Sequence, residues 1–254
     1  MPADQSPQFA TTRWSLIRDA GHNRTSTART ALEELCRQYW FPVYAFIRRQ
    51  GNSAADAEDL TQAFFVYFLE SAFVKAADRD RGRFRSFLLK SVSNFVKADH
   101  RARASQKHGG TAEILSLDFA SGEQQYGQLA ADTATPVQLF ERRWAMTVLQ
   151  KVAHRLRSEY EQRNHSLLYT LLEPHMNQSA ERLPYEQLCE PLNMSEEAVR
   201  QTVRRMKLRY RELLRAEIAG TVASPSEIDD ELRTLLNALA VSDPTTTDES
   251  QAPD

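Results

Sequence analysis

Apolar residues in the N-terminal half of the chain recur at steps of three and four positions, the spacing of amphipathic helices. The pattern predicts three helices there, over residues 27–50, 53–70 and 83–103. Pro42 lies inside the first helix and should kink it or mark a junction, because proline removes a hydrogen bond to the residue four positions earlier. Gly51 should end this helix and Ser53 should cap the next one, so the boundary between them has a local signal.

The helical spacing is lost over residues 105–135, which contain four of the chain's eight glycines. We therefore predict an extended linker for this segment. Helices resume beyond it, over residues 137–162, 166–173, 185–192 and from 196 onward. Asn193 should form the turn between the last two, since asparagine tolerates a left-handed backbone, and Ser195 should cap the final helix.

The helix after Ser195 has an apolar face and a separate cationic face. The apolar positions are Val199, Val203, Met206, Tyr210 and Leu213 or Leu214. The cationic positions are Arg200, Arg204, Lys207 and Arg211, while Arg209 and Arg215 are expected to be solvated or to face a partner. Two helices joined by a short turn, the second with a cationic outer face, match the helix-turn-helix plan for the DNA major groove. A helical hairpin with a solvated face is the alternative.

The composition favours an all-α protein. Of the 254 residues, 41% are hydrophobic and 26% are charged, with few glycines and no sustained apolar–polar alternation. No apolar run approaches the roughly 18–20 residues that span a bilayer, and the N-terminus lacks the pattern of a secretory signal. Cys36 and Cys189 are interpreted as small apolar side chains, so we expect a protein of the reducing cytoplasm.

Motifs of the common catalytic and metal sites are not found in the sequence. The six histidines are scattered, with no HExxH motif and no cysteine partners at zinc spacing. There is no GxGxxG, Walker loop or GxSxG motif either. We therefore expect no enzymatic activity, metal or cofactor. An enzyme acting on nucleic acid through carboxylates from distant positions is the alternative, but no arranged carboxylate cluster is visible.

The formal net charge of −2 conceals strong local bias. Residues 75–107 contain ten basic and three acidic side chains, a net charge of +7, and the final helix of the 183–215 stretch is also basic. Each cationic segment could neutralise phosphates of a nucleic acid, although either one alone is more simply a solvated face. Acidic residues gather at Asp56, Glu58 and Asp59 and in the tail after Thr221.

Several segments together resemble the sigma factors of the extracytoplasmic-function (ECF) type, two-domain subunits that direct RNA polymerase to promoters. LCRQYWFPVYAFIRRQG and DAEDLTQAFFVYFLE are similar to sigma region 2.1–2.2, and DRDRGRFRSFLLKSVSNFVKADHRARASQKHGG is similar to regions 2.3–2.4. YEQLCEPLNMSEEAVRQTVRRMKLRYRELL is similar to regions 4.1–4.2. The chain departs from the family at Phe87-Leu88, where Trp-Leu is usual, at Asn193 in place of glycine and at Cys189 in place of alanine.

The resemblance implies two helical domains joined by a flexible linker, with a helix-turn-helix in the C-terminal domain. The implied segments are an N-terminal arm (1–27), a sigma-2-like domain (28–104), the linker (105–135), a sigma-4-like domain (136–220) and an acidic extension (221–254) outside the family plan. The implied partners are core RNA polymerase and promoter DNA. An anti-sigma factor or another regulator is a further partner that stays open.

The resemblance also assigns roles to three groups of residues. Region 2.2 of the family docks on the polymerase, which implies this role for Asp56, Glu58, Asp59 and Gln62. Region 2.3–2.4 opens and reads the −10 element, which implies DNA binding by Asn94, Lys97, His100, Arg101 and Arg103. Region 4.2 reads the −35 element, which implies DNA binding by Ser195, Arg200, Gln201, Arg204 and Lys207. For the acids of the first group, complementing a helix dipole is the alternative role, and docking is favoured because Gln62 extends the polar face beyond the first turn.

The loop 78–84 matches the family's specificity loop, and Phe84 and Phe87 could receive an unstacked base beside it. Aromatic residues at helical spacing are more often part of a core, so we predict core positions for both.

The main alternative function is a stand-alone helix-turn-helix transcription regulator in which residues 1–135 form a sensor or oligomerisation domain. The basic stretch 75–107 argues against this alternative, because a sensor domain has no need of it.

The tail contains PSEIDDELRTLLNAL, which should form a short acidic amphipathic helix around Ile228, Leu232, Leu235 and Leu236. Three roles stay open for this helix. It could dock on a basic face of the same chain as a brake, bind a regulator, or extend into solvent as an appendage.

Overall fold

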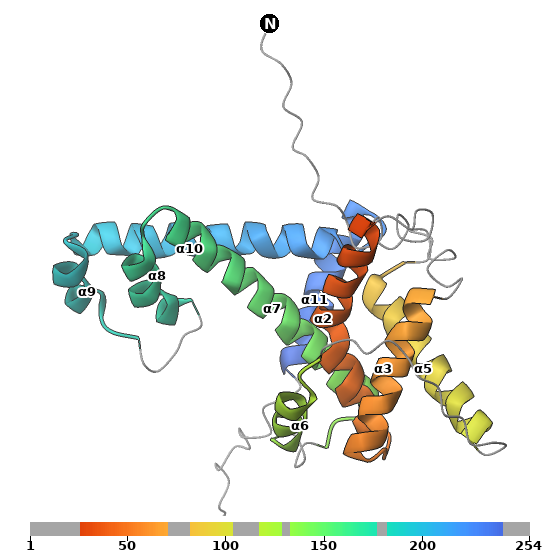
Figure 1. Cartoon of the computed structure of the whole chain (residues 1–254). Helices are drawn as coiled ribbons and strands as arrows, with labels where there is room; N and C mark the ends of the chain where they lie inside the picture. Colours follow the sequence, from red (N-terminus) through yellow and green to blue (C-terminus); the bar gives the residue numbers. More distant parts are fainter. Residues whose placement is uncertain (1–25, 71–81, 104–116, 129–132, 177–181, 241–254) are drawn as a thin grey trace, which may run out of the picture. The chain divides into compact units, whose positions relative to one another are not determined.

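Every regular element that the computed structural model describes is a helix (Figure 1), which confirms the all-α prediction for this part of the chain. The structure describes residues 26–70, 82–103, 117–128, 133–176 and 182–240, so most of the predicted N-terminal arm lies outside the described residues. The elements are α2 (Ser26–Arg49), α3 (Ala54–Glu70), α5 (Phe84–Arg103), α6 (Phe119–Gly127), α7 (Pro136–Gln162), α8 (Ser166–Leu172), η2 (Glu173–His175), α9 (Tyr185–Leu192), α10 (Glu196–Ala219), η3 (Pro225–Glu227) and α11 (Ile228–Ala240). None of the described helices combines the length and the apolarity needed to cross a membrane.

The chain divides into two compact units. Unit 1 combines Met1–Thr147 with Ala219–Asp254, and unit 2 is the continuous stretch Val148–Ile218. The boundaries fall inside α7 and at the end of α10, so each of these helices contributes to both units.

The core of unit 1 forms around α2, which packs against α3, α5 and α6. The buried positions of α2 recur at helical spacing, as do those of α3 and α5, because one side of each helix faces the others. These buried residues are Cys36, Tyr39, Val43, Phe46 and Ile47 of α2, Leu60, Phe64 and Phe68 of α3, and Phe84, Leu88, Val92 and Val96 of α5. Pro42 does not form a junction, since α2 continues through it.

The boundary between α2 and α3 follows the sequence prediction. Gly51 has a φ of 92°, in the left-handed region that glycine enters at little cost. The Oγ atom of Ser53 accepts a hydrogen bond from the backbone N–H of Asp56 at 3.1 Å, which is the expected N-cap contact.

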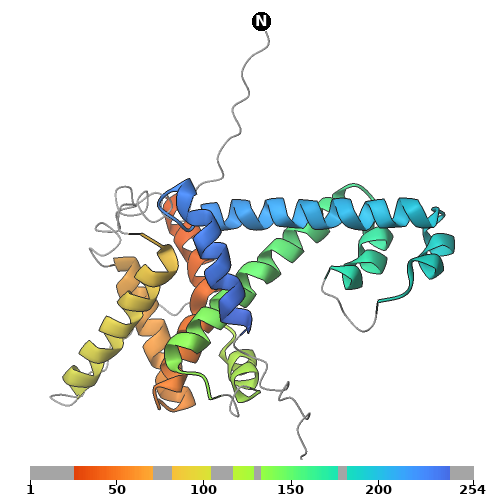
Figure 2. The same ribbon diagram turned by 180° about the vertical axis from the view of Figure 1, so that it is seen from behind.

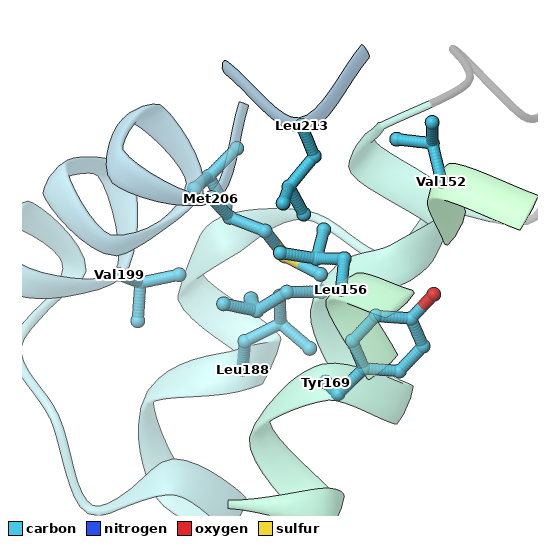
Figure 3. Close-up of a cluster of buried hydrophobic side chains, with 9 residues drawn as sticks. Val152, Leu156, Tyr169, Leu188, Val199, Met206 and Leu213 are labelled. Atoms are coloured by element: carbon cyan, nitrogen blue, oxygen red, sulfur yellow. The ribbon is translucent and has the colours of Figure 1, made fainter. Parts of the chain in front are cut away.

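The core of unit 2 is a cluster of nine buried side chains (Figure 3). They are Val152 and Leu156 of α7, Tyr169 and Leu172 of α8, Leu188 of α9, and Val199, Val203, Met206 and Leu213 of α10. The predicted apolar face of α10 is therefore confirmed at these four positions. Tyr210 is half-buried against the cluster, and its hydroxyl donates a hydrogen bond to the backbone oxygen of Leu149 at 3.4 Å.

Helix α6 lies where the sequence pattern predicted an extended linker, so that prediction is wrong for residues 119–127. Asp118 caps the helix by accepting a hydrogen bond from the backbone N–H of Ser121 at 3.1 Å. Phe119 and Tyr126 are buried, and the rings of Phe119 and Trp40 meet edge to face with centroids 5.2 Å apart. A helix of nine residues is too short to show a sustained period in sequence, and it depends on such tertiary contacts.

Candidate nucleic-acid and partner interfaces

The turn between α9 and α10 fixes where the cationic face of α10 begins. Asn193 adopts the left-handed conformation, with φ 49° and ψ 48°, as predicted. The backbone N–H of Met194 donates to the oxygen of Cys189 at 3.0 Å and that of Asn193 donates to the oxygen of Glu190 at 3.1 Å, the two bonds of a Schellman motif. Ser195 then caps α10, its Oγ atom accepting from the N–H of Ala198 at 3.3 Å.

The predicted DNA-binding side chains of α10 lie on its outer side. Arg200, Gln201 and Arg204 are exposed and Lys207 is half-buried, whereas Val199, Val203 and Met206 face the core of unit 2. Since an α-helix turns by about 100° per residue, these two sets occupy different faces. The structure thus brings the four outer side chains together on one accessible surface, which we call the α10 outer face.

Acidic residues of the first turn of α10 hold two of these side chains. Arg200 forms an ion pair with Glu196 at 2.5 Å, and the Nε2 atom of Gln201 donates to Glu197 at 2.8 Å. The Arg200 guanidinium also lies 5.9 Å from the ring centre of Tyr185. Each exposed i, i+4 pair contributes only about 0.3–0.5 kcal/mol, so a stronger acceptor such as a phosphate or a guanine edge can replace these partners.

Arg209 is exposed, as predicted, but the sequence did not predict that it is paired within unit 2. Its guanidinium binds both carboxylate oxygens of Glu159 on α7, from Nε and from Nη2, at 2.8 Å each. The hydrogen bond from Arg209 lowers the pKa of Glu159, and the carboxylate in turn raises the pKa of Arg209. Arg209 therefore joins two helices of unit 2.

A second basic surface lies on α5 in unit 1. Asn94, Lys97, His100 and Arg101 are exposed on the side of α5 away from the buried Leu88, Val92 and Val96. The Nε atom of Arg101 donates to the backbone oxygen of Lys97 at 3.1 Å. The backbone of Arg103 is helical, but its side chain lies outside the described residues. We call this surface the α5 outer face.

The aromatic residues at the start of α5 contribute to the core. Phe84 is fully buried, with its ring centre 5.4 Å from that of Tyr39. Phe87 is half-buried, and its ring centre lies 6.0 Å from that of Phe68. The core prediction is thus confirmed for Phe84 and holds in part for Phe87. Residues 78–81 of the predicted specificity loop lie outside the described residues.

The basic stretch 75–107 is not cationic along its whole length. Arg85, at the start of α5, is only 5% exposed and forms ion pairs with Glu141 of α7 and Glu231 of α11. Arg83 pairs with the same Glu231 at 3.2 Å. The exposed cationic side chains of the DNA-binding prediction are therefore in the later turns of α5.

The predicted polymerase-docking residues lie in the first three turns of α3. Asp59 is exposed, while Asp56, Glu58 and Gln62 are half-buried. The Oγ atom of Ser53 donates to the carboxylate of Asp56 at 2.5 Å, so Asp56 takes part in the N-cap of its own helix. Glu58 lines a shallow open depression whose other acids, Asp118 and Glu123, come from α6. The sequence pattern missed the contribution of α6, because it predicted no helix there.

Glu123 also fixes α6 to α2. It accepts hydrogen bonds from Arg48 Nε at 3.0 Å and Arg48 Nη2 at 2.7 Å, and from the hydroxyl of Tyr44. Arg48 lowers the pKa of Glu123, and burial together with Glu123 raises the pKa of the Tyr44 hydroxyl. These three groups hold α6 against α2, and Tyr44 and Glu123 also line the depression beside Glu58.

His175 is a buried histidine in unit 2. Its ring stacks on that of Tyr185, with centroids 4.8 Å apart and planes 24° apart. Burial lowers the pKa of His175, and the positive charges of Arg182 and Lys207 lower it further. Within the described residues, no group of three or more histidine, cysteine or acidic side chains is placed to hold a metal ion.

No protein-family model matches the chain, and searches of curated proteins and of solved structures find no match either.

Proposed function

We propose that this protein is a sigma factor of the ECF type, which binds core RNA polymerase and directs it to promoters. The observation that supports this function best is the presence of two exposed cationic helix faces, the α10 outer face in unit 2 and the α5 outer face in unit 1. A protein that binds two separated promoter elements needs one such face in each of two units. The sequence resemblance to sigma regions 2 and 4 supplies the order of the two faces along the chain.

In this proposal α9 and α10 form a helix-turn-helix that reads the −35 element. Arg200, Gln201 and Arg204 lie in the first three turns of α10, the part of a recognition helix that contacts base edges. An arginine side chain can donate two hydrogen bonds to the O6 and N7 atoms of guanine, and a glutamine side chain can pair with the edge of adenine. Ser195 and Lys207 flank these residues and contact phosphates.

The α5 outer face binds the −10 element. Lys97 and Arg101 supply positive charge for the backbone, and Asn94 and His100 supply donors and acceptors for bases. The acidic start of α3 docks on basic side chains of the polymerase through Glu58, Asp59 and Gln62, with Asp56 beside them. The protein itself does no catalysis in this proposal.

Association with purified core RNA polymerase tests the proposal. The wild-type chain should co-sediment with the polymerase, and the double variant Glu58→Lys/Asp59→Lys should bind at least about tenfold more weakly because it sets like charges against each other. Glu161→Lys/Glu190→Lys is the matched control, since it makes the same charge change at exposed acids of unit 2. Equal weakening by both variants would contradict docking through α3.

The stand-alone regulator is the second outcome of the same experiment. Failure of the wild-type chain to associate with polymerase, together with tight binding of duplex DNA by the protein alone, would favour it. A sigma factor should instead bind duplex DNA weakly without polymerase, because each face neutralises few phosphates.

A further inference from the structure

The acidic tail helix α11 (dark blue in Figure 2) is part of unit 1 and packs within it rather than extending into solvent. Leu235 is fully buried, Ile228 and Leu232 are half-buried, and Leu236, next to Leu235, is 59% exposed. The helix therefore turns one apolar side toward the rest of unit 1 and leaves the opposite side in water.

The central contact of α11 is a carboxylate with no exposed surface. Glu231 is 0% exposed, and its Oε1 atom accepts from Nε of Arg85 at 3.1 Å. Its Oε2 atom lies 3.2 Å from Nε of Arg83 and 3.5 Å from Nη2 of Arg85. Burying a carboxylate is costly unless cations accompany it, so the position of α11 depends on these two arginines.

Two further contacts place α11 and the turn before it at the start of α5. The backbone N–H of Phe84 donates to the oxygen of Thr221 at 2.8 Å, and Nη1 of Arg83 lies 3.4 Å from the hydroxyl oxygen of Thr234. Arg85 is also held from α7, through its ion pair with Glu141 and by Trp144, whose ring centre is 5.4 Å from the guanidinium carbon.

We propose that α11 is an intramolecular cover over the cationic start of α5, which single-stranded DNA displaces by taking Arg83 and Arg85 from Glu231. The inference rests on the proposed function in one respect, that α5 faces the opened −10 strand. The phosphates of that strand and the carboxylate of Glu231 are both anionic oxygen acceptors for arginine, so they compete for the same two guanidinium groups. The acids Asp229, Asp230 and Glu231, against Arg233 alone, also oppose the approach of DNA to this end of α5.

The first test compares Glu231→Gln with Asp230→Asn. Both variants remove one negative charge from the first turn of α11, but Asp230 is exposed and its ion pair with Arg233 lies on the surface of the same helix. Binding of a fluorescent 20-nucleotide single strand of mixed sequence is followed by anisotropy between about 50 and 200 mM salt. Glu231→Gln should bind several-fold more tightly, with a slope of log K against log salt that is steeper by about 0.7 for each arginine released to a phosphate. A slope equal to that of Asp230→Asn would overturn the proposal.

The second test uses the unaltered chain, so it does not depend on whether Glu231→Gln folds. Backbone amides of residues 228–240 should exchange with solvent faster when the same oligonucleotide is present, while amides of unit 2 core helices should not. Unchanged or slower exchange in 228–240 would show that DNA binds without moving α11 and would refute the cover. Neither readout involves polymerase, so a failure to bind polymerase would count against the sigma-factor function and leave this result standing.

Discussion

Glu159 of α7 and Arg209 of α10 form a bidentate ion pair between the two helices, in which each carboxylate oxygen lies 2.8 Å from a guanidinium nitrogen. The two residues are 50 positions apart in the sequence. A planar guanidinium facing a carboxylate in this way fixes the relative rotation of the two helices as well as their separation. The pair therefore sets the orientation of the α10 outer face on unit 2.

A double-mutant cycle on this pair should give a coupling free energy of about 0.5–1 kcal/mol, the upper part of the range for surface ion pairs. The variants are Arg209→Ala, Glu159→Ala and their combination, with stability measured by urea unfolding. The control is the pair Arg157–Glu161, which is more exposed and lies within α7. Its coupling should be smaller, because water screens a pair in which both groups are exposed. Equal coupling in the two cycles would contradict a special role for Arg209.

Replacing Gly122 should loosen the contact of α6 with α2. A Cβ atom at this position would lie 2.6 Å from the Cη2 atom of Trp40, and an indole ring cannot yield as a flexible chain end does. Gly122→Ala should therefore lower the free energy of unfolding by about 1–3 kcal/mol and speed amide exchange in residues 119–127. Gly127→Ala in the same helix is the control, because nothing lies within 4 Å of its added Cβ. It should be neutral or slightly stabilising.

The stability of unit 2 should depend on pH through His175. Its pKa in the folded protein is lowered from the ordinary value of 6.5, so the unfolded chain takes up a proton first as the pH falls. This contribution to stability is full above pH 6.5 and is lost as the pH falls toward the lower folded pKa. The free energy of unfolding should therefore fall less between pH 7.5 and 5.5 in His175→Phe, which keeps a ring against Tyr185, than in the wild type. A similar effect from His154→Asn, at an exposed position of α7, would argue against His175.

The α10 outer face should account for binding to −35 DNA. Under the proposed function, Arg204→Ala should reduce the affinity of the polymerase complex for a promoter duplex by about 1–3 kcal/mol if Arg204 reads a base. If Arg204 instead contacts a phosphate, the magnitude of the slope of log K against log salt concentration should fall by about 0.9. The sequence preference should then stay the same. Arg157→Ala, an exposed arginine of α7, is the matched control. No change in either quantity would exclude Arg204 from the interface.

The helices and their caps could be predicted from the sequence where the signal is local. Ser53 and Ser195 cap helices because a hydroxyl reaches a backbone N–H three positions later, and Asn193 turns left-handed because its side chain tolerates that backbone. The apolar face of α10 follows from a three- and four-residue spacing, which also places Arg200 and Arg204 outside. These features require no knowledge of the rest of the chain.

The contacts between distant segments could not be predicted in the same way. Arg209 was expected to be solvated or to face a partner, and Arg85 was counted only as part of the basic stretch 75–107. The fold alone shows that Glu159 and Glu231 pair with them. One signal was present for the second pair. Arg85 precedes Leu88 by three positions and Glu231 precedes Leu235 by four, so both charges lie within apolar helix faces. A charge at such a position indicates a buried partner.

The discontinuity of unit 1 has a consequence for the newly made chain. Unit 2 is one unbroken stretch and can close once Ile218 has left the ribosome, whereas Arg85 must wait for Glu231, which is made 146 residues later. At about 5–20 residues per second this delay is roughly 7–30 s. During that interval Arg83 and Arg85 at the start of α5 cannot yet form their ion pairs with Glu231. A polypeptide truncated before α11 would never form these pairs.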